Sequence, residues 1–316
     1  MRRLIGFSLI VALLLALLTF TLISALRRTF PDQIGTIVFE MGSFDSSASE
    51  FDELDVDRLK PNSLFFGQQF ERLIDPVSTF QEISVDDLDC APDGQSILVS
   101  SQYLYRLDVQ NGALKQLTSD PRLIYALAWS ADQQQIVFTD VSNRQRSIYI
   151  ANADGSHPLQ ILASQDFGSS LAWSPDSRKI ALSTTSDPLE RHYTISLIDT
   201  ATHTLDQIYE SPDNLGQVSW SPDGTRIAFQ MWRQGRFDIY TIQPDGSHLT
   251  QLTFDNAQNA DPRWSPDGTM ISYSALDGSD HYQLYVMNAD GSDPHLVFAA
   301  PHDQDAFNLC WLRASR

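Results

Sequence analysis

Short apolar runs recur along the chain, and a similar polar turn precedes each of them. In the clearest copy the turn reads Ser-Pro-Asp-Gly and the run that follows reads Ile-Ala-Phe, within residues 219–229. Runs of three to five β-branched, aliphatic or aromatic residues between such turns predict β-strands rather than helices. A further strand follows in each copy, for example residues 283–286, and then an Asp-Gly dipeptide, which is a strong hairpin signal. The pattern predicts antiparallel hairpins along most of the chain.

The repeat has a regular period. A tryptophan stands before the turn in most copies, and the equivalent positions are separated by 39, 44, 47, 44 and 47 residues: Cys90, Trp129, Trp173, Trp220, Trp264 and Trp311. A period of about 40–45 residues is typical of one four-stranded blade of a β-propeller. We therefore expect an all-β fold, a propeller of six four-stranded blades formed by residues 34–316.

The last copy of the repeat has only its first strand, around Trp311. A closed ring leaves no edge unpaired at the junction of its ends. We expect residues 35–39 and 51–57 to supply the second and third strands, so that the sixth blade is a composite of both ends of the chain. Seven blades are the alternative, with residues 58–85 forming a degenerate repeat.

These repeats resemble those of the TolB-like β-propeller family, in which Trp-Ser-Pro-Asp-Gly precedes an Ile-Ala-Phe strand. Residues 219–229 and 284–291 match that pattern closely, and the resemblance covers about residues 34–316. It implies the propeller fold, with the motif tryptophans and aspartates packing between blades and capping turns. TolB itself carries an α/β domain before the propeller, and no counterpart is seen here, so we expect a TolB-like protein rather than TolB.

The N-terminus carries an uncharged apolar run, Leu4 to Leu26, with two arginines on each side. At about 1.5 Å per residue, its 23 residues form a helix of roughly 34 Å, enough to cross a hydrocarbon core of about 30 Å. We expect a membrane anchor at residues 1–28 and a short linker at 29–33; a cleaved signal peptide, leaving a secreted or periplasmic protein, is the alternative. The flanking arginines tie, and the free amino terminus favours a topology with the propeller outside the cytoplasm.

The composition is strongly acidic. The chain has 40 acidic and 21 basic residues, a formal charge of −19; four of the basic residues flank the apolar run, so the rest carries about −23. This balance argues against nucleic acid as a partner, because phosphate binding needs clustered lysines and arginines. It also indicates that the propeller stands away from anionic lipid headgroups.

The chain has two cysteines, and both fall where the ring should close. Cys90 replaces the motif tryptophan of the first blade, and Cys310 directly precedes Trp311 of the composite blade. Because side chains alternate along a strand, the two thiols are aimed either at each other or both away. A disulfide, which an oxidising compartment permits, and two buried free thiols both remain open.

The loops between the second and third strands of each blade are the longest and most varied connections. Loops on a rigid scaffold are common binding sites, and tryptophan with arginine is the usual composition of an interaction hot spot. The alternative is a set of ordinary solvated loops. The binding residues that we predict on this face are Arg144, Arg191, Trp232, Arg233 and Arg236.

No catalytic motif emerges, and no Gly-x-Ser-x-Gly nucleophile elbow occurs. His157, His248 and His295 follow outer turns of separate blades, so we predict neither a metal site nor a cofactor. We therefore predict a monomeric, non-catalytic scaffold that binds a protein or an envelope component outside the cytoplasm. The alternative is a carbohydrate-active lyase or hydrolase acting at the channel mouth, because some TolB-like propellers resemble sugar lyases.

Overall fold

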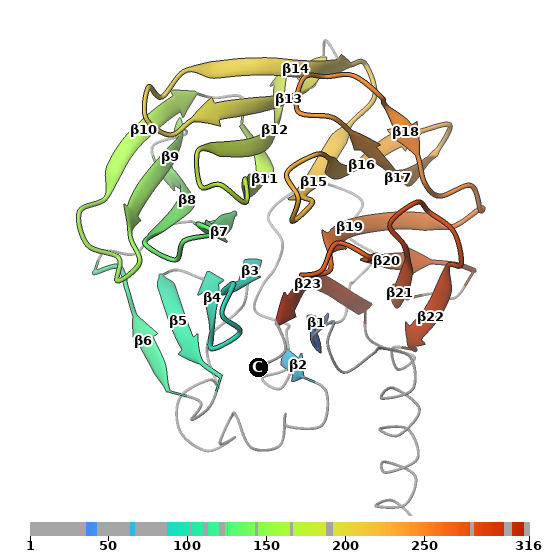
Figure 1. The fold of residues 1–316 in the computed structure, drawn as a ribbon, viewed down its shortest axis with the longest axis horizontal. Coiled ribbons are helices and arrows are strands. Elements are labelled where there is room, and N and C mark those ends of the chain that lie inside the picture. The colour runs from blue at the N-terminus through green and yellow to red at the C-terminus, as the bar shows by residue number, and fades with distance from the viewer. Residues whose placement is uncertain are drawn as a thin grey trace, which may run out of the picture.

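The computed structural model describes residues 36–42, 64–66, 87–100, 103–109, 113–119, 124, 126–142, 145–164, 167–187, 192–278, 281–299 and 305–312. Within these ranges 23 strands form six antiparallel sheets around a central axis (Figure 1). The predicted β-propeller is confirmed. The prediction of six four-stranded blades is wrong, because five sheets have four strands and the sixth has three in the described residues.

The strands are grouped by their position from the centre of the ring outwards. The innermost strands of blades 1 to 6 are β3 (Asp87–Cys90), β7 (Leu127–Trp129), β11 (Phe167–Trp173), β15 (Leu215–Trp220), β19 (Gln258–Trp264) and β23 (Asp305–Leu312). The second strands are β4 (Ser96–Ser100), β8 (Gln135–Ser142), β12 (Lys179–Asp187), β16 (Ile227–Arg233), β20 (Met270–Leu276) and β1 (Thr36–Gly42).

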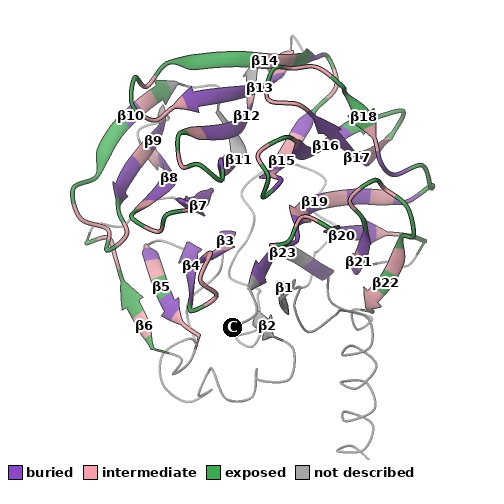
Figure 2. Ribbon diagram, viewed as in Figure 1, coloured by how far each residue is buried: buried purple, intermediate pink, exposed green. Residues whose placement is uncertain are grey.

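The third strands are β5 (Leu104–Asp108), β9 (Gln145–Asn152), β13 (His192–Asp199), β17 (Arg236–Ile242), β21 (Gln283–Asn288) and β2 (Leu64–Phe66). The outermost strands of the five complete blades are β6 (Leu114–Gln116), β10 (Leu159–Ser164), β14 (Leu205–Ser211), β18 (Thr250–Gln251) and β22 (His295–Phe298). Exposure increases towards these outer strands, and β10 and β14 are largely exposed (Figure 2).

Blade 6 joins the two ends of the described chain. Strand β1 pairs with β23 in an antiparallel register that sets Val38 opposite Cys310, so the predicted pairing of an N-terminal with the C-terminal strand is confirmed. The third strand of this sheet is β2, where we had expected residues 51–57, which lie outside the described residues.

The repeated polar turn is held by its own side chains. In blade 4 the hydroxyl of Ser221 donates to Asp223 (2.6 Å) and accepts the backbone N–H of Arg226 (2.9 Å). The Ser221 hydroxyl is also the main cause that lowers the pKa of Asp223 below its usual value. The same serine–aspartate pair recurs in blades 2, 3 and 5. The motif aspartates therefore stabilise the turn between the first and second strands.

Adjacent blades are joined near the axis by hydrogen bonds from side chains to the neighbouring inner strand. Asp89 accepts the N–H of Trp129 (2.7 Å) and Ser170 that of Val218 (2.9 Å). Ser219 likewise accepts the N–H of Trp264 (3.2 Å). Between blades 6 and 1 the link is covalent. Cys90 and Cys310 form a disulfide, with an S–S distance of 2.00 Å and a Cα–Cα distance of 5.6 Å.

The predicted anchor, Leu4 to Leu26, and the linker at 29–33 lie outside the described residues. In the portion of the chain that the structure does describe, no helix has the length and apolar character needed to cross a membrane.

Candidate functional site

The hairpin between β16 and β17 of blade 4 carries the two arginines that define the site. A two-residue turn, Gln234-Gly235, connects the strands, and both residues have positive φ (54° and 87°). Positive φ at both central positions is the signature of a type I′ turn, which fits the twist of a two-residue hairpin. The turn sets Arg233 directly opposite Arg236, so their side chains emerge on the same face of the sheet.

The register places two arginines at opposite cross-strand positions on one face, an arrangement that is unfavourable unless other groups offset the repulsion between like charges. Arg233 has 56% of its side chain exposed; its Nε lies 3.9 Å from a carboxylate oxygen of Asp213, and the guanidinium acts to lower the pKa of Tyr240. Arg236 is less exposed, and its Nε donates to Asp238 at 3.2 Å.

Asp238 is almost fully buried and forms the floor of the site. It accepts three hydrogen bonds of 3.2 Å each: from Arg236 Nε, from Gln251 Nε2 and from Thr253 Oγ1. A buried carboxylate is tolerated when donors satisfy its oxygens. Asp238 therefore holds Arg236 and Gln251 in place from below.

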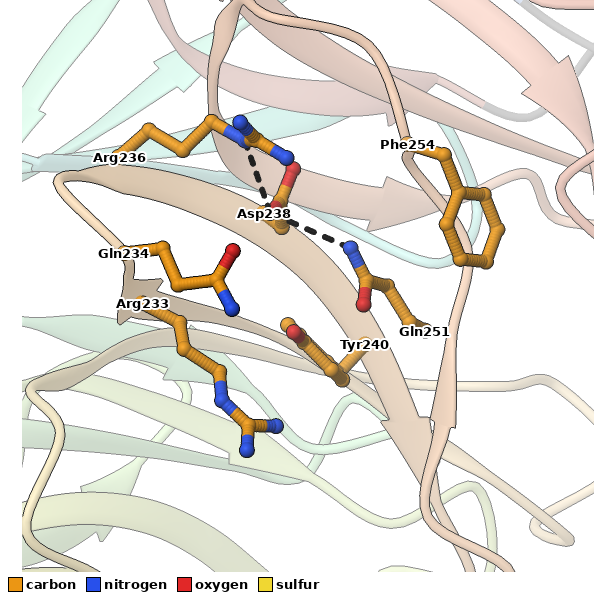
Figure 3. Close-up of a pocket in the computed structure, with 7 residues that line it drawn as sticks. All are labelled: Arg233, Gln234, Arg236, Asp238, Tyr240, Gln251 and Phe254. Atoms are coloured by element: carbon orange, nitrogen blue, oxygen red, sulfur yellow. Dashed lines mark hydrogen bonds and ion pairs between the residues drawn. The ribbon is translucent and has the colours of Figure 1, made fainter.

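These side chains line a pocket of about 200 Å³. Its walls come from the hairpin, from β17 and β18, and from the loop after β18, which contributes Phe254 (Figure 3). Phe254 is 74% exposed, the most exposed large hydrophobic residue of the described chain. Burial raises the pKa of Tyr240, while its contact with Arg233 acts in the opposite direction. The phenol is therefore a neutral hydrogen-bonding group at ordinary pH. The pocket residues are Arg233, Gln234, Arg236, Asp238, Tyr240, Gln251 and Phe254.

The structure brings together some of the predicted binding residues and separates others. Arg233 and Arg236 share the pocket. Trp232 points to the opposite face of the blade, where it is 39% exposed and packs edge-on against Phe237 at 5.0 Å. Arg144 and Arg191 lie outside the described residues.

Five other pocket residues were not predicted as binding residues from the sequence; one of them, Gln234, is the first residue of the hairpin turn between the two arginines. Asp238 and Tyr240 could have been predicted from the sequence, because residues two and four positions after Arg236 on a strand lie on the same face as Arg236. Gln251 and Phe254 could not, since only the register of β18 and the path of the loop after it bring them to the hairpin.

A second group of charges lies near the axis, on the innermost strands. Arg263 of β19 forms an ion pair with Asp261 (3.1 Å) and donates to the carbonyl of Leu309 on β23 (2.8 Å). Across the centre, burial raises the pKa of Asp87 to about 8 and that of Asp89 to about 6, and the charge of Arg263 acts against both shifts.

The acidic side chains near the axis already accept hydrogen bonds from backbone groups of the next blade. Asp87 accepts the N–H of Leu127 (3.1 Å), and Asp261 accepts that of Leu309 (2.7 Å). Their geometry joins blades to one another. Within the described ranges, no cluster of three histidine, cysteine or acidic side chains is arranged to hold a metal ion.

The sheets and their circular closure define the class of this protein as a β-propeller. Residues 141–305 match the family model described as the TolB beta propeller domain. The chain therefore belongs to that family, as its repeats indicated.

The relatives are distant, and the match to curated proteins is partial. A segment of 115 residues is 29% identical to the Tol-Pal system protein TolB of Francisella tularensis subsp. mediasiatica (strain FSC147), covering 35% of this chain and 26% of that protein. The chain thus matches about a quarter of the length of this relative.

Solved structures share the fold at low sequence identity. A putative TolB from Agrobacterium tumefaciens superposes with a TM-score of 0.65 at 17% identity, covering 88% of this chain and 98% of that one. TolB from Acinetobacter baumannii gives 0.67 at 16%, covering 89% and 67%. An oligogalacturonate lyase from Vibrio parahaemolyticus gives 0.55 at 15%, covering 84% and 74%. At these identities the likeness concerns the fold alone.

Proposed function

We propose that this protein is a non-catalytic binding scaffold, held at the membrane by residues 4–26, with a monomeric propeller outside the cytoplasm that binds a protein partner. The apolar N-terminal run supports the location, and the acidity of the remaining chain supports a propeller that stands clear of the lipid surface. A secreted or periplasmic form produced by signal cleavage would bind the same partner.

The observation that carries this proposal is the pocket at the β16–β17 hairpin of blade 4. Two arginines beside the turn of a rigid hairpin and an exposed aromatic ring on a nearby loop converge there. Arginine and aromatic side chains are enriched among the residues that dominate protein interfaces. Trp232, on the opposite face of the same blade, extends the candidate interface around the hairpin.

Affinity capture from solubilised membranes, with the full chain as bait, tests the proposal. A bait carrying Trp232→Ala and Arg233→Ala should lose the captured partner, because both side chains are exposed at the proposed interface. The matched control is Arg178→Ala, which removes an exposed arginine from the opposite end of blade 3. Equal capture by the double variant and the wild type would place the interface elsewhere.

A carbohydrate-active enzyme remains the second candidate, favoured by the fold shared with the oligogalacturonate lyase. A lyase of this kind would generate unsaturated sugar ends from oligogalacturonate, and these ends are measured by ultraviolet absorbance. Turnover of oligogalacturonate by the purified chain would replace the scaffold proposal with this one.

A further inference from the structure

We infer that the blade 4 pocket binds a single carboxylate side chain, presented by an extended segment of the partner, with an apolar neighbour of that residue against Phe254. This inference rests on the proposed scaffold function and names the chemistry that the site would recognise.

Unused hydrogen-bond donors are the first argument. A guanidinium carries five N–H donors, and Arg236 uses its Nε on Asp238. Among the described residues its terminal amino groups have no other partner. Because Asp238 fixes Nε, the remaining donors are preorganised rather than free to rotate, and a planar fork of donors matches the two oxygens of a carboxylate.

Charge is the second argument. Arg233 and Arg236 lie opposite each other on one face, and Asp238 is the one anion among the described residues that line the pocket. Its oxygens already accept three hydrogen bonds. An added carboxylate between the arginines would relieve the like-charge repulsion of the cross-strand pair. The chain as a whole carries −19, so it repels broadly acidic partners at long range. The fitting ligand is therefore one carboxylate within a neutral or basic segment.

Size is the third argument. Sites for drug-sized molecules and cofactors usually enclose about 300–1,000 Å³, and this pocket has about 200 Å³. The space suits one amino-acid side chain rather than a whole cofactor. Phe254, at 74% exposed, offers an apolar surface at the rim for the adjacent residue.

The neighbouring strand favours a peptide over a sugar. Gln251, a pocket residue, belongs to β18, the outermost strand of blade 4, and no described strand pairs with the outer edge of β18. Such an edge presents backbone N–H and C=O groups to which an extended peptide can add as a further strand. A peptide can thus place its carboxylate in the pocket while its backbone runs along β18.

The test uses two blocked pentapeptides that differ in one residue: alanine-valine-glutamate-leucine-alanine and the same peptide with glutamine in the centre. Calorimetric or NMR titration of the full chain should show the glutamate peptide binding at least tenfold more tightly, since a hydrogen bond to a charged group contributes about 1.5–3 kcal/mol. Arg236→Gln and Arg233→Gln should each reduce this preference. Phe254→Ala should weaken both peptides equally, because it removes only apolar contact.

Two controls keep the test decisive. Arg178→Gln, an exposed arginine of the opposite end of blade 3, should leave both affinities unchanged. Arg233 and Phe254 are exposed, so their variants should unfold at the wild-type temperature even if Arg236→Gln does not. Equal affinity for the two peptides, no binding of either at millimolar concentration, or tighter binding of trigalacturonate than of the glutamate peptide would each overturn the inference. If the full wild-type chain still captures a partner from membranes in those cases, the scaffold function stands. If the wild-type chain captures no partner, the scaffold function itself is refuted.

Discussion

At the scale of single residues, the same side chains that define the ring also control its response to pH. Asp87 is buried beside the axis, out of contact with solvent. The charged groups that act on it are Arg263, Asp261 and Asp89. Burial raises its pKa from 3.8 to about 8, with Arg263 opposing the shift. The folded protein therefore keeps this carboxyl protonated at a pH where the unfolded chain has released the proton.

The sign of the resulting pH dependence follows from linkage. A raised pKa stabilises the fold fully below about pH 4, and this contribution is lost as pH rises towards about 8. As pH rises over that range, we expect the ionisation of Asp87 to lower the free energy of unfolding by up to about 1.4 kcal/mol per pH unit. Chemical denaturation of the wild type and of Asp87→Asn at several pH values measures this slope. A variant whose slope equals that of the wild type would show that Asp87 is ionised in the folded state.

The candidate site also shows what could be predicted from individual residues. Arg233 and Arg236, both predicted as binding residues, lie opposite each other because a hairpin pairs the residues on either side of its turn; their role in binding stays a prediction. Trp232, their sequence neighbour, was grouped with them and lies on the other face, since adjacent side chains on a strand point in opposite directions. Phe254 enters the pocket from a loop whose path no local pattern specifies.

At the scale of elements, the Asp-Gly turns after the third strands do more than reverse the chain. Gly291 has φ of +86°, and a Cβ added there would lie 2.8 Å from the carbonyl oxygen of Leu252 in the preceding blade. Gly155 and Gly246 approach the preceding blades in the same way, at Leu117 and Ile208. The repeated glycine therefore permits close contact between blades as well as a positive φ.

Two glycine substitutions separate the cost of a positive φ from the cost of crowding the preceding blade. Gly235 has nearly the same φ, +87°, but nothing lies within 4 Å of the added Cβ. Gly235→Ala should cost about 1–2 kcal/mol of unfolding free energy, from backbone conformation alone. Gly291→Ala should cost roughly 1–3 kcal/mol more, because the blade must shift to admit the methyl group. Urea denaturation compares the two, and equal losses would mean that the blade contact is not tight.

At the scale of the whole molecule, the ends of the chain hold the ring together. Strand β23 pairs with β1, and the disulfide between Cys90 and Cys310 spans 220 residues of sequence. In the chain-entropy model, a cross-link over so long a loop stabilises the fold by about 5 kcal/mol, because it restricts the unfolded chain. Blade 6 has three described strands, so this covalent link reinforces the smallest sheet.

The covalent closure predicts a measurable response to reduction. We expect Cys90→Ser with Cys310→Ser to unfold at a lower denaturant concentration than the oxidised wild type, and to match the wild type treated with a reductant. Mass spectrometry after thiol alkylation without reduction should find no alkylated cysteine. Two alkyl groups on the native protein would instead identify free thiols at this junction.

The sequence by itself determined the repeat, the four-stranded organisation of blades 1 to 5 and the family, because period and turn chemistry are local properties that each blade expresses in its own 39–47 residues. Tertiary structure decided the rest. It determined that β2 pairs with β1 in blade 6, that Cys90 faces Cys310, and that Phe254 joins Arg233 and Arg236 around one pocket. Each of these outcomes depends on which residues meet across a sheet or between blades, and that is settled only when the ring closes.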